Sequence, residues 1–257
     1  MDTMPPADIY LDGLAYDAMF YGGDDLAFWL DLADRHGDPV LELACGTGRV
    51  SMPLARAGFR VTGLDAAPAM LEVARSRAEQ EGIDITWVEG DMRDFDLGGQ
   101  FALILCPANA FLHLLTRADI EACLAAIRRH LAPGGRFALD IFIPKPELLV
   151  DAPGRQLPFG EYDDPGGRGH VIVTHSYVYE AHTQIKRITT THTLQRTAGA
   201  DEVHTGTLTM RMIFPQELDA LLEYNGFNVT GKYEDYANTP VGPTSGKQLT
   251  VCKPAGD

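Results

Sequence analysis

A short apolar run that passes directly into a turn of small residues, VLELACGTGRV at 40–50, limits most strongly what this chain can fold into. The apolar residues of 40–43 predict a buried strand. Gly46 and Gly48 leave almost no side chain in the turn, so a ligand can approach the main chain closely. The segment therefore predicts a strand and turn of the kind that places backbone against a nucleoside.

The charge of Glu42 separates this turn from the usual phosphate-binding turns. A GxGxxG turn places a pyrophosphate on the N-terminus of the next helix, and a carboxylate so near would repel it. Ser51 also stands where the third glycine of that motif belongs, and no lysine follows either glycine as in a GK[ST] loop. The segment favours a ligand that is cationic or donates hydrogen bonds. A turn without any ligand fits these residues alone equally well.

Four further strand-like runs follow, and helical stretches alternate with them. FRVTGLD ends at Asp65, ITWVEGDM contains Asp91 near its end, FALILCPANA is almost wholly apolar, and APGGRFALDIF is a turn that leads into a strand. Helices are predicted at 25–36, 49–57, 68–81 and 118–130. Such alternation predicts a parallel sheet covered on both faces. Asp65 has the spacing at which these folds place an acid over a ribose, although a plain turn residue is the alternative.

Residues 144–213 interrupt this alternation. The Pro- and Gly-rich stretch 144–169 predicts a lid or binding loop. Three runs follow (HVIVTHSYVYE, QIKRITTTHTLQR and EVHTGTLTMRMIF), and they predict an antiparallel sheet with turns at 181–184 and 198–201. PQELDALLEYNGF then predicts a helix that ends at Asn225-Gly226, and NVTGKYEDY with KQLTVCK predicts a closing antiparallel hairpin. We divide the chain into an N-terminal cap (1–36), a cofactor-binding core (37–143), a lid loop and β cap (144–213), and the rest of the core (214–257).

These segments, in this order, resemble the class I S-adenosylmethionine-dependent methyltransferases over essentially all of residues 10–254. The matching stretches are ELACGTG, GLDAAPAML, EGDMRDF, CPANAFLHLL, HLAPGGRFALD and ELDALLEYNGF. The resemblance implies a doubly wound α/β fold with a seven-stranded, mostly parallel sheet in the order 3-2-1-4-5-7-6, strand 7 antiparallel. The inserted sheet resembles the small antiparallel β cap of small-molecule methyltransferases, including sugar N-methyltransferases. The family commonly has Gly where this chain has Ala44, and we expect a slightly tighter turn there without loss of function.

The resemblance also implies S-adenosyl-L-methionine as cofactor and S-adenosyl-L-homocysteine as product. Glu42 would bind the cofactor's amino group, Arg49 its carboxylate and Asp65 both ribose hydroxyls. Asp91 would bind the adenine amino group, with the Met92 backbone N–H at a ring nitrogen. The other residues expected to contact the cofactor are Tyr16, Tyr21, Ala44, Gly46, Gly48, Ala66, Met70 and Cys106. A solvated surface carboxylate is the alternative for Asp91, and core packing the alternative for Met70.

Methyl transfer from a sulfonium needs mainly alignment of the acceptor lone pair and exclusion of water. Asn109 and His113 follow the fourth strand, beside the expected sulfonium. His113 has an ordinary pKa that suits deprotonation of an acceptor, or it is a structural histidine. Asn109 orients the acceptor or caps the next helix.

Aromatic residues outside the core are the other candidates for catalysis and acceptor binding. Tyr16 and Tyr21 close over the cofactor and acceptor or pack on the core, and Tyr16 is also a candidate catalytic residue. His175 and Tyr177 share one face of the β cap with Val171 and Val173. That face suits a small organic acceptor or a dimer interface.

The amino-acid composition limits which kinds of binding partner the protein can have. The chain has 21 basic and 36 acidic residues and a net charge of -15 without a basic cluster, which argues against nucleic acid and against anionic membranes. It lacks an apolar stretch of roughly 20 residues, a signal-peptide pattern, paired cysteine spacing and clustered metal ligands. We therefore expect a cytoplasmic, metal-free enzyme with free thiols, a monomer or a homodimer through the β cap. The alternatives are a nicotinamide-dependent oxidoreductase on a related fold and a non-catalytic cofactor-binding protein.

Overall fold

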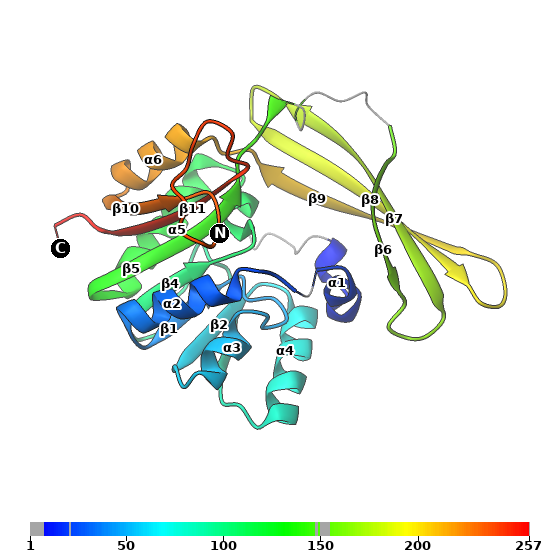
Figure 1. Cartoon of the computed structure of the whole chain (residues 1–257), viewed down its shortest axis with the longest axis horizontal. Helices are drawn as coiled ribbons and strands as arrows, with labels where there is room; N and C mark the ends of the chain where they lie inside the picture. The colour runs from blue at the N-terminus through cyan, green and yellow to red at the C-terminus, as the bar shows by residue number, and fades with distance from the viewer. Residues whose placement is uncertain (1–7, 21, 147–148, 150–154, 257) are drawn as a thin grey trace.

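The computed structural model describes residues 8–20, 22–146, 149 and 155–256. Seven strands form one sheet in the order β10-β11-β5-β4-β1-β2-β3 (Figure 1). They are β1 (Val40–Leu43), β2 (Val61–Asp65), β3 (Thr86–Glu89), β4 (Phe101–Cys106), β5 (Leu131–Phe142), β10 (Phe227–Tyr233) and β11 (Lys247–Pro254). The first five are parallel, and β11 is antiparallel to both β5 and β10. The predicted strand order, 3-2-1-4-5-7-6 within this sheet, is confirmed.

Helices cover both faces of this sheet. The helical elements are η1 (Asp8–Tyr10), α1 (Gly13–Phe20), α2 (Leu26–His36), α3 (Ser51–Arg56), α4 (Pro68–Glu81), η2 (Ala110–His113), α5 (Arg117–His130) and α6 (Pro215–Tyr224). Side chains alternate along β4 because successive strand residues point to opposite faces. Leu103 and Leu105 pack in a cluster with Trp29 of α2, whereas Ile104 and Cys106 pack in a cluster with residues of α5 and α6. None of the described helices is long and apolar enough to cross a membrane.

A second sheet forms the β cap, and it has four strands where the sequence predicted three. Its order is β6 (Leu157–Asp163), β7 (Gly169–Glu180), β8 (Ile185–Arg196) and β9 (Glu202–Arg211), all antiparallel. The prediction of a loop over all of 144–169 was wrong at β6. This strand lies at the edge of the sheet, and its register with β7 shifts between Pro158 and Gly160. An edge strand tolerates such residues because one side of it needs no partner.

The helix α1 lies between the core and the β cap (Figure 1). Oδ1 of Asp12 caps its N-terminus by accepting hydrogen bonds from the backbone N–H groups of residues 14 and 15, at 3.1 and 3.0 Å. Asp17 accepts a hydrogen bond of 2.6 Å from the Thr47 hydroxyl and pairs with Arg77 of α4. On the other side, the Asp8 carboxylate accepts a hydrogen bond from the backbone of β9. The N-terminal segment is therefore attached to both the core and the β cap.

Candidate active site

A cavity of about 140 Å³ lies at the carboxyl ends of the parallel strands, where open α/β sheets bind ligands. It brings together residues from the turns after β1, β2, β3 and β4 and from the N-terminal segment. These residues are Tyr10, Tyr16, Ala44, Gly46, Leu64, Asp65, Ala66, Ala67, Met70, Gly90, Asp91, Met92, Pro107, Ala108, Ala110 and His113. Nine of the residues singled out from the sequence are among them. We call this space the edge cavity.

The turn after β1 brings main chain to the wall of the edge cavity. Ala44 and Gly46 both have positive φ angles, of 53° and 56°. A Cβ on Gly46 would lie 3.3 Å from the methyl carbon of Met70, so this close approach suits glycine. Ala44 adopts a backbone conformation that costs an L-residue about 1 kcal/mol or more. The turn is thus tight, as the sequence predicted.

Asp65 ends β2 at the edge cavity with both carboxylate oxygens already oriented. Its Oδ2 accepts a hydrogen bond of 2.7 Å from the Gly46 N–H, and its Oδ1 accepts one of 2.8 Å from the Ala67 N–H. Burial raises the pKa of Asp65, and these backbone donors oppose that rise. Each carboxylate oxygen can accept more than one hydrogen bond, so the group retains capacity for the hydroxyls of a ribose.

Asp91 lies at the edge cavity as an ionised acceptor held by Arg93. The Arg93 backbone N–H and guanidinium both donate to its carboxylate, and the guanidinium also reaches Asp119 at 2.9 Å. Burial works to raise the pKa of Asp91, but the Arg93 hydrogen bonds outweigh it and the pKa lies below its ordinary value. Met92 follows it along the wall, and Met70, which is 2% exposed, lines the cavity while it packs in the interior.

The comparisons with known proteins agree with this geometry. Residues 40–135 match the model of a methyltransferase domain. The chain is 29% identical over 242 residues to the cypemycin N-terminal methyltransferase of a Streptomyces species, and the alignment covers 92% of this chain and 93% of that protein. Residues 40–135 thus match a methyltransferase domain, and nearly the whole chain is similar to S-adenosylmethionine-dependent methyltransferases.

Solved structures of methyltransferases extend the likeness to the whole chain, β cap included. DesVI from Streptomyces venezuelae has a TM-score of 0.72 at 25% identity and covers 96% of this chain and 98% of its own. CalS10, an amino pentose methyltransferase from Micromonospora echinaspora solved with S-adenosylmethionine, has a TM-score of 0.69 at 27% identity and covers 93% and 94%. Three further relatives align over 49%, 48% and 36% of their own length.

His113 forms a buried pair with Tyr10, a residue that the sequence had not marked as a cavity residue. The Tyr10 hydroxyl lies 2.8 Å from Nε2 of His113. Burial lowers the pKa of His113 to about 4, against a smaller opposing effect of a hydrogen bond with the Thr209 backbone. Burial also raises the pKa of Tyr10. His113 is therefore neutral and a weak base at pH 7, which favours the structural interpretation over the catalytic one.

Glu42 and Arg49 lie behind the turn rather than at the wall of the edge cavity. Glu42 is 3% exposed and accepts a hydrogen bond of 2.5 Å from the Ser51 hydroxyl. Burial raises the pKa of Glu42 to about 8, although the Ser51 hydrogen bond opposes the rise. Arg49 donates two hydrogen bonds to Asp25, of 2.5 and 2.7 Å. The contacts of these two residues with the cofactor stay predictions.

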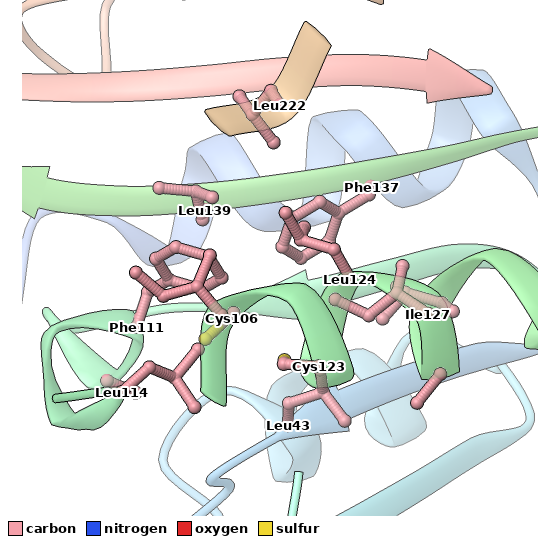
Figure 2. Close-up of a cluster of buried hydrophobic side chains, with 14 of the residues drawn as sticks. Leu43, Cys106, Phe111, Leu114, Cys123, Leu124, Ile127, Phe137, Leu139 and Leu222 are labelled. Atoms are coloured by element: carbon pink, nitrogen blue, oxygen red, sulfur yellow. The ribbon is translucent and has the colours of Figure 1, made fainter. Parts of the chain in front are cut away.

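Gly48 and Cys106 do not line the edge cavity. A Cβ on Gly48 would lie 2.8 Å from the ring of Trp87, so this glycine makes room for an indole rather than for a ligand. Cys106 points to the α5 face of β4 and is fully buried beside Cys123 (Figure 2). The side chain of Cys106 alternates away from the cavity, and its contact with the cofactor stays a prediction.

Asn109 has a role that neither prediction gave it. Its backbone is left-handed, with φ at 64°, and its side-chain oxygen accepts a hydrogen bond of 2.7 Å from the Phe142 N–H. It stands at the N-cap position of η2 but makes no side-chain capping bond, and it does not line the edge cavity. Asp140 supports the same turn by accepting a hydrogen bond of 2.6 Å from the Ala108 N–H. A single acid inside the apolar run FALDIF was the only sequence signal of this second support.

His175 and Tyr177 lie on the β cap and do not line the edge cavity. The ring of His175 packs 5.1 Å from that of Phe159 and 6.0 Å from that of Tyr177, and the Lys186 ammonium lies 3.3 Å from the Tyr177 ring centre. Their assignment to acceptor binding therefore stays a prediction. Tyr21 lies outside the described residues.

Tyr16 connects the two sides of α1. The centre of its ring lies 5.6 Å from that of Tyr10 and 4.8 Å from that of Phe20. The Phe20 ring in turn lies 6.0 Å from the ring of Phe159 on the β cap. Burial raises the pKa of Tyr16, so it is a neutral phenol at pH 7. The ring packs on other aromatic rings and also lines the edge cavity, and its contact with the cofactor and the acceptor stays a prediction.

Proposed function

We propose that this protein transfers a methyl group from S-adenosyl-L-methionine to nitrogen, oxygen or carbon of a small organic acceptor. The observation that carries this proposal is the edge cavity, where Asp65 and the main chain of Gly46 meet at the carboxyl end of the parallel sheet. The near full-length likeness to CalS10 and to the cypemycin N-terminal methyltransferase supports it.

The residues at the edge cavity fit the chemistry of this cofactor. Asp65 offers carboxylate oxygens to the ribose hydroxyls, and Asp91 is an ionised acceptor for the adenine amino group. Met70 and Leu64 add apolar surface for a purine. When bound, the cofactor supplies an activated methyl group on a sulfonium, and the side chains hold and orient the reactants and exclude water.

The size of the edge cavity adds one requirement. Its volume of about 140 Å³ is below the roughly 300 Å³ at which small-molecule pockets begin. Tyr10 and Tyr16 belong to the N-terminal segment and form part of the wall. We infer that this segment shifts outward when the cofactor enters and then covers it.

The buried pair of Tyr10 and His113 bears on the mechanism. A base with a pKa of about 4 takes few protons from an acceptor at pH 7. Methyl transfer here accordingly depends on proximity and orientation, with the acceptor reacting in its deprotonated form. A cytoplasmic location, and a monomer or a homodimer through the β cap, complete the proposal.

Calorimetry with S-adenosylmethionine and S-adenosylhomocysteine tests the cofactor site. Wild-type protein should bind both, and Asp65→Ala should weaken binding about 100-fold because two charge-assisted hydrogen bonds are lost. Asp65→Asn should lose about tenfold, since one acceptor oxygen remains. Asp34→Asn, which removes an exposed acid on α2, is the control and should bind as wild type. No binding by wild type, or equal binding by the Asp65 variants, would contradict the proposal.

A further inference from the structure

A second and larger cavity lies on the other side of α1, between this helix and the β cap. Its volume is about 640 Å³, enough for an organic molecule of moderate size. Met19 and Phe20 of α1 face Val171 and Leu194 of the cap sheet across it, so its interior has apolar walls. We call it the cap cavity.

The charges that line the cap cavity are mostly negative. Four carboxylates belong to its wall, against one guanidinium, that of Arg168. Arg168 donates to Asp164 at 2.6 Å and lies 3.6 Å from Glu202, so two of the carboxylates share its single positive charge. The other two, Asp8 and Asp12, lie on the N-terminal segment and are exposed. An apolar interior with this excess of negative charge favours an organic cation over a neutral molecule or an anion.

The negative charge of Asp12 is not required for its role in capping α1. Its Oδ1 alone accepts both hydrogen bonds that cap α1. An amide oxygen caps a helix as well as a carboxylate oxygen does. The negative charge of Asp12 is therefore separable from its structural role.

We propose that the cap cavity binds the methyl acceptor, and that this acceptor is an amine carried on an apolar body. The inference rests on the proposed methyl transfer, because it makes the cap cavity the acceptor site of that reaction. Tyr16 lines the cap cavity and the edge cavity alike, so one side chain of α1 lies at the wall of both spaces. An amine beside Tyr16 lies next to the space assigned to the methyl donor.

The reaction balances with groups at this site and water. The amine binds as an ammonium ion and releases one proton to water at the open rim, where Asp12, Glu202 and His204 are exposed. The nitrogen lone pair then forms the N–C bond while the S–C bond breaks, and the positive charge passes from sulfur to nitrogen. Carboxylates around the cavity stabilise the charge that develops on nitrogen.

Fluorescence anisotropy with a matched pair of probes tests the inference in the presence of saturating S-adenosylhomocysteine. N-dansylcadaverine carries a primary amine on an apolar body, and its N-acetyl derivative has the same body without the charge. The amine should bind about tenfold more tightly than the acetyl derivative. Asp12→Asn keeps the helix cap and should weaken binding of the amine about fivefold without affecting the acetyl derivative. Asp34→Asn, an equal change in net charge on α2, should affect neither.

A second variant locates the probe. Ala15 lines the cap cavity but not the edge cavity, so Ala15→Phe should reduce binding of the amine while S-adenosylhomocysteine binding, measured by calorimetry, stays at the wild-type value. Equal binding of both probes, or an amine affinity that neither variant changes, overturns the inference and leaves the proposed function standing if S-adenosylhomocysteine still binds. If the protein binds the amine selectively but does not bind S-adenosylhomocysteine, the proposed methyl transfer is wrong. The assignment of the cap cavity as the acceptor site is then wrong as well.

Discussion

Lowering the pH from 7 to 5 should remove stability that His113 contributes to the folded protein. Burial lowers the pKa of this imidazole from its ordinary 6.5 to about 4. Between these two values the unfolded chain binds a proton that the folded protein excludes. The contribution is therefore fully present above pH 6.5 and is lost as the pH falls through 4. The whole shift corresponds to about 3 kcal/mol, of which about 2 kcal/mol is lost by pH 5.

Comparison with His113→Gln isolates this contribution from the other titrating groups. Glu42 opposes it, because burial raises the pKa of that carboxyl to about 8 and its stability contribution is regained as the pH falls. The glutamine amide has an oxygen to accept from the Tyr10 hydroxyl and an N–H to donate, and it does not titrate. Urea unfolding at pH 7 and pH 5 should show the wild type losing about 2 kcal/mol relative to the variant.

The ring protons of His113 provide the direct measurement. Their NMR shifts in the folded protein should titrate near pH 4, with the neutral form persisting at pH 6. Parallel loss of stability in wild type and variant, or a ring that titrates near 6.5, would refute the reasoning. His113 would then be available as a general base after all.

Three substitutions test the packing around the cofactor turn. Ala44→Gly should stabilise the protein by about 1 kcal/mol in urea unfolding, because glycine adopts the positive φ at this position without strain; an equal loss would show that the turn is not strained. Gly48→Ala should cost about 2 kcal/mol, seen as a lower Tm, since φ is 84° and the added carbon meets the Trp87 ring at 2.8 Å; an unchanged Tm would contradict this packing. Arg49→Met should lower the free energy of unfolding in urea by about 3 kcal/mol, because Asp25 is left buried without its two guanidinium hydrogen bonds. A loss below about 1 kcal/mol would contradict a strong Arg49–Asp25 ion pair.

The core could be predicted from the sequence because its signals are local. The helix α4 begins at Pro68 and ends where Gly82 takes a left-handed conformation, as predicted for 68–81. The cap strands β7, β8 and β9 end at the predicted turns, since their Val, Ile and Thr alternate with a period of two. These patterns report on propensity and burial within one segment.

Two elements gave no such signal. The helix α1 has eight residues, fewer than the roughly 11 to 18 over which a periodic pattern becomes readable, and contacts with the core and the β cap stabilise it. The strand β6 contains Pro158 and Gly160, which predict a loop, and it forms a strand because β7 provides a partner.

At the candidate site the sequence predicted correctly which residues lie at the carboxyl edge of the sheet. It did not predict which neighbours their side chains contact. Asp65 and Asp91 lie at the edge cavity because strand ends and spacing decide their position. Whether Glu42 faces a ligand or Ser51, and whether Cys106 faces the cavity or α5, depends on which face of a strand each side chain takes.

By itself, then, the sequence determined the order of strands, the likeness to methyltransferases and the strand ends that form the edge cavity. Only the tertiary structure decided that Tyr10 meets His113, 103 positions away, and that burial turns this histidine into a weak base. It also decided that α1 separates two cavities that share Tyr16. The physical reason is that charge state and cavity shape depend on neighbours brought together by folding, whereas a sequence pattern describes one segment at a time.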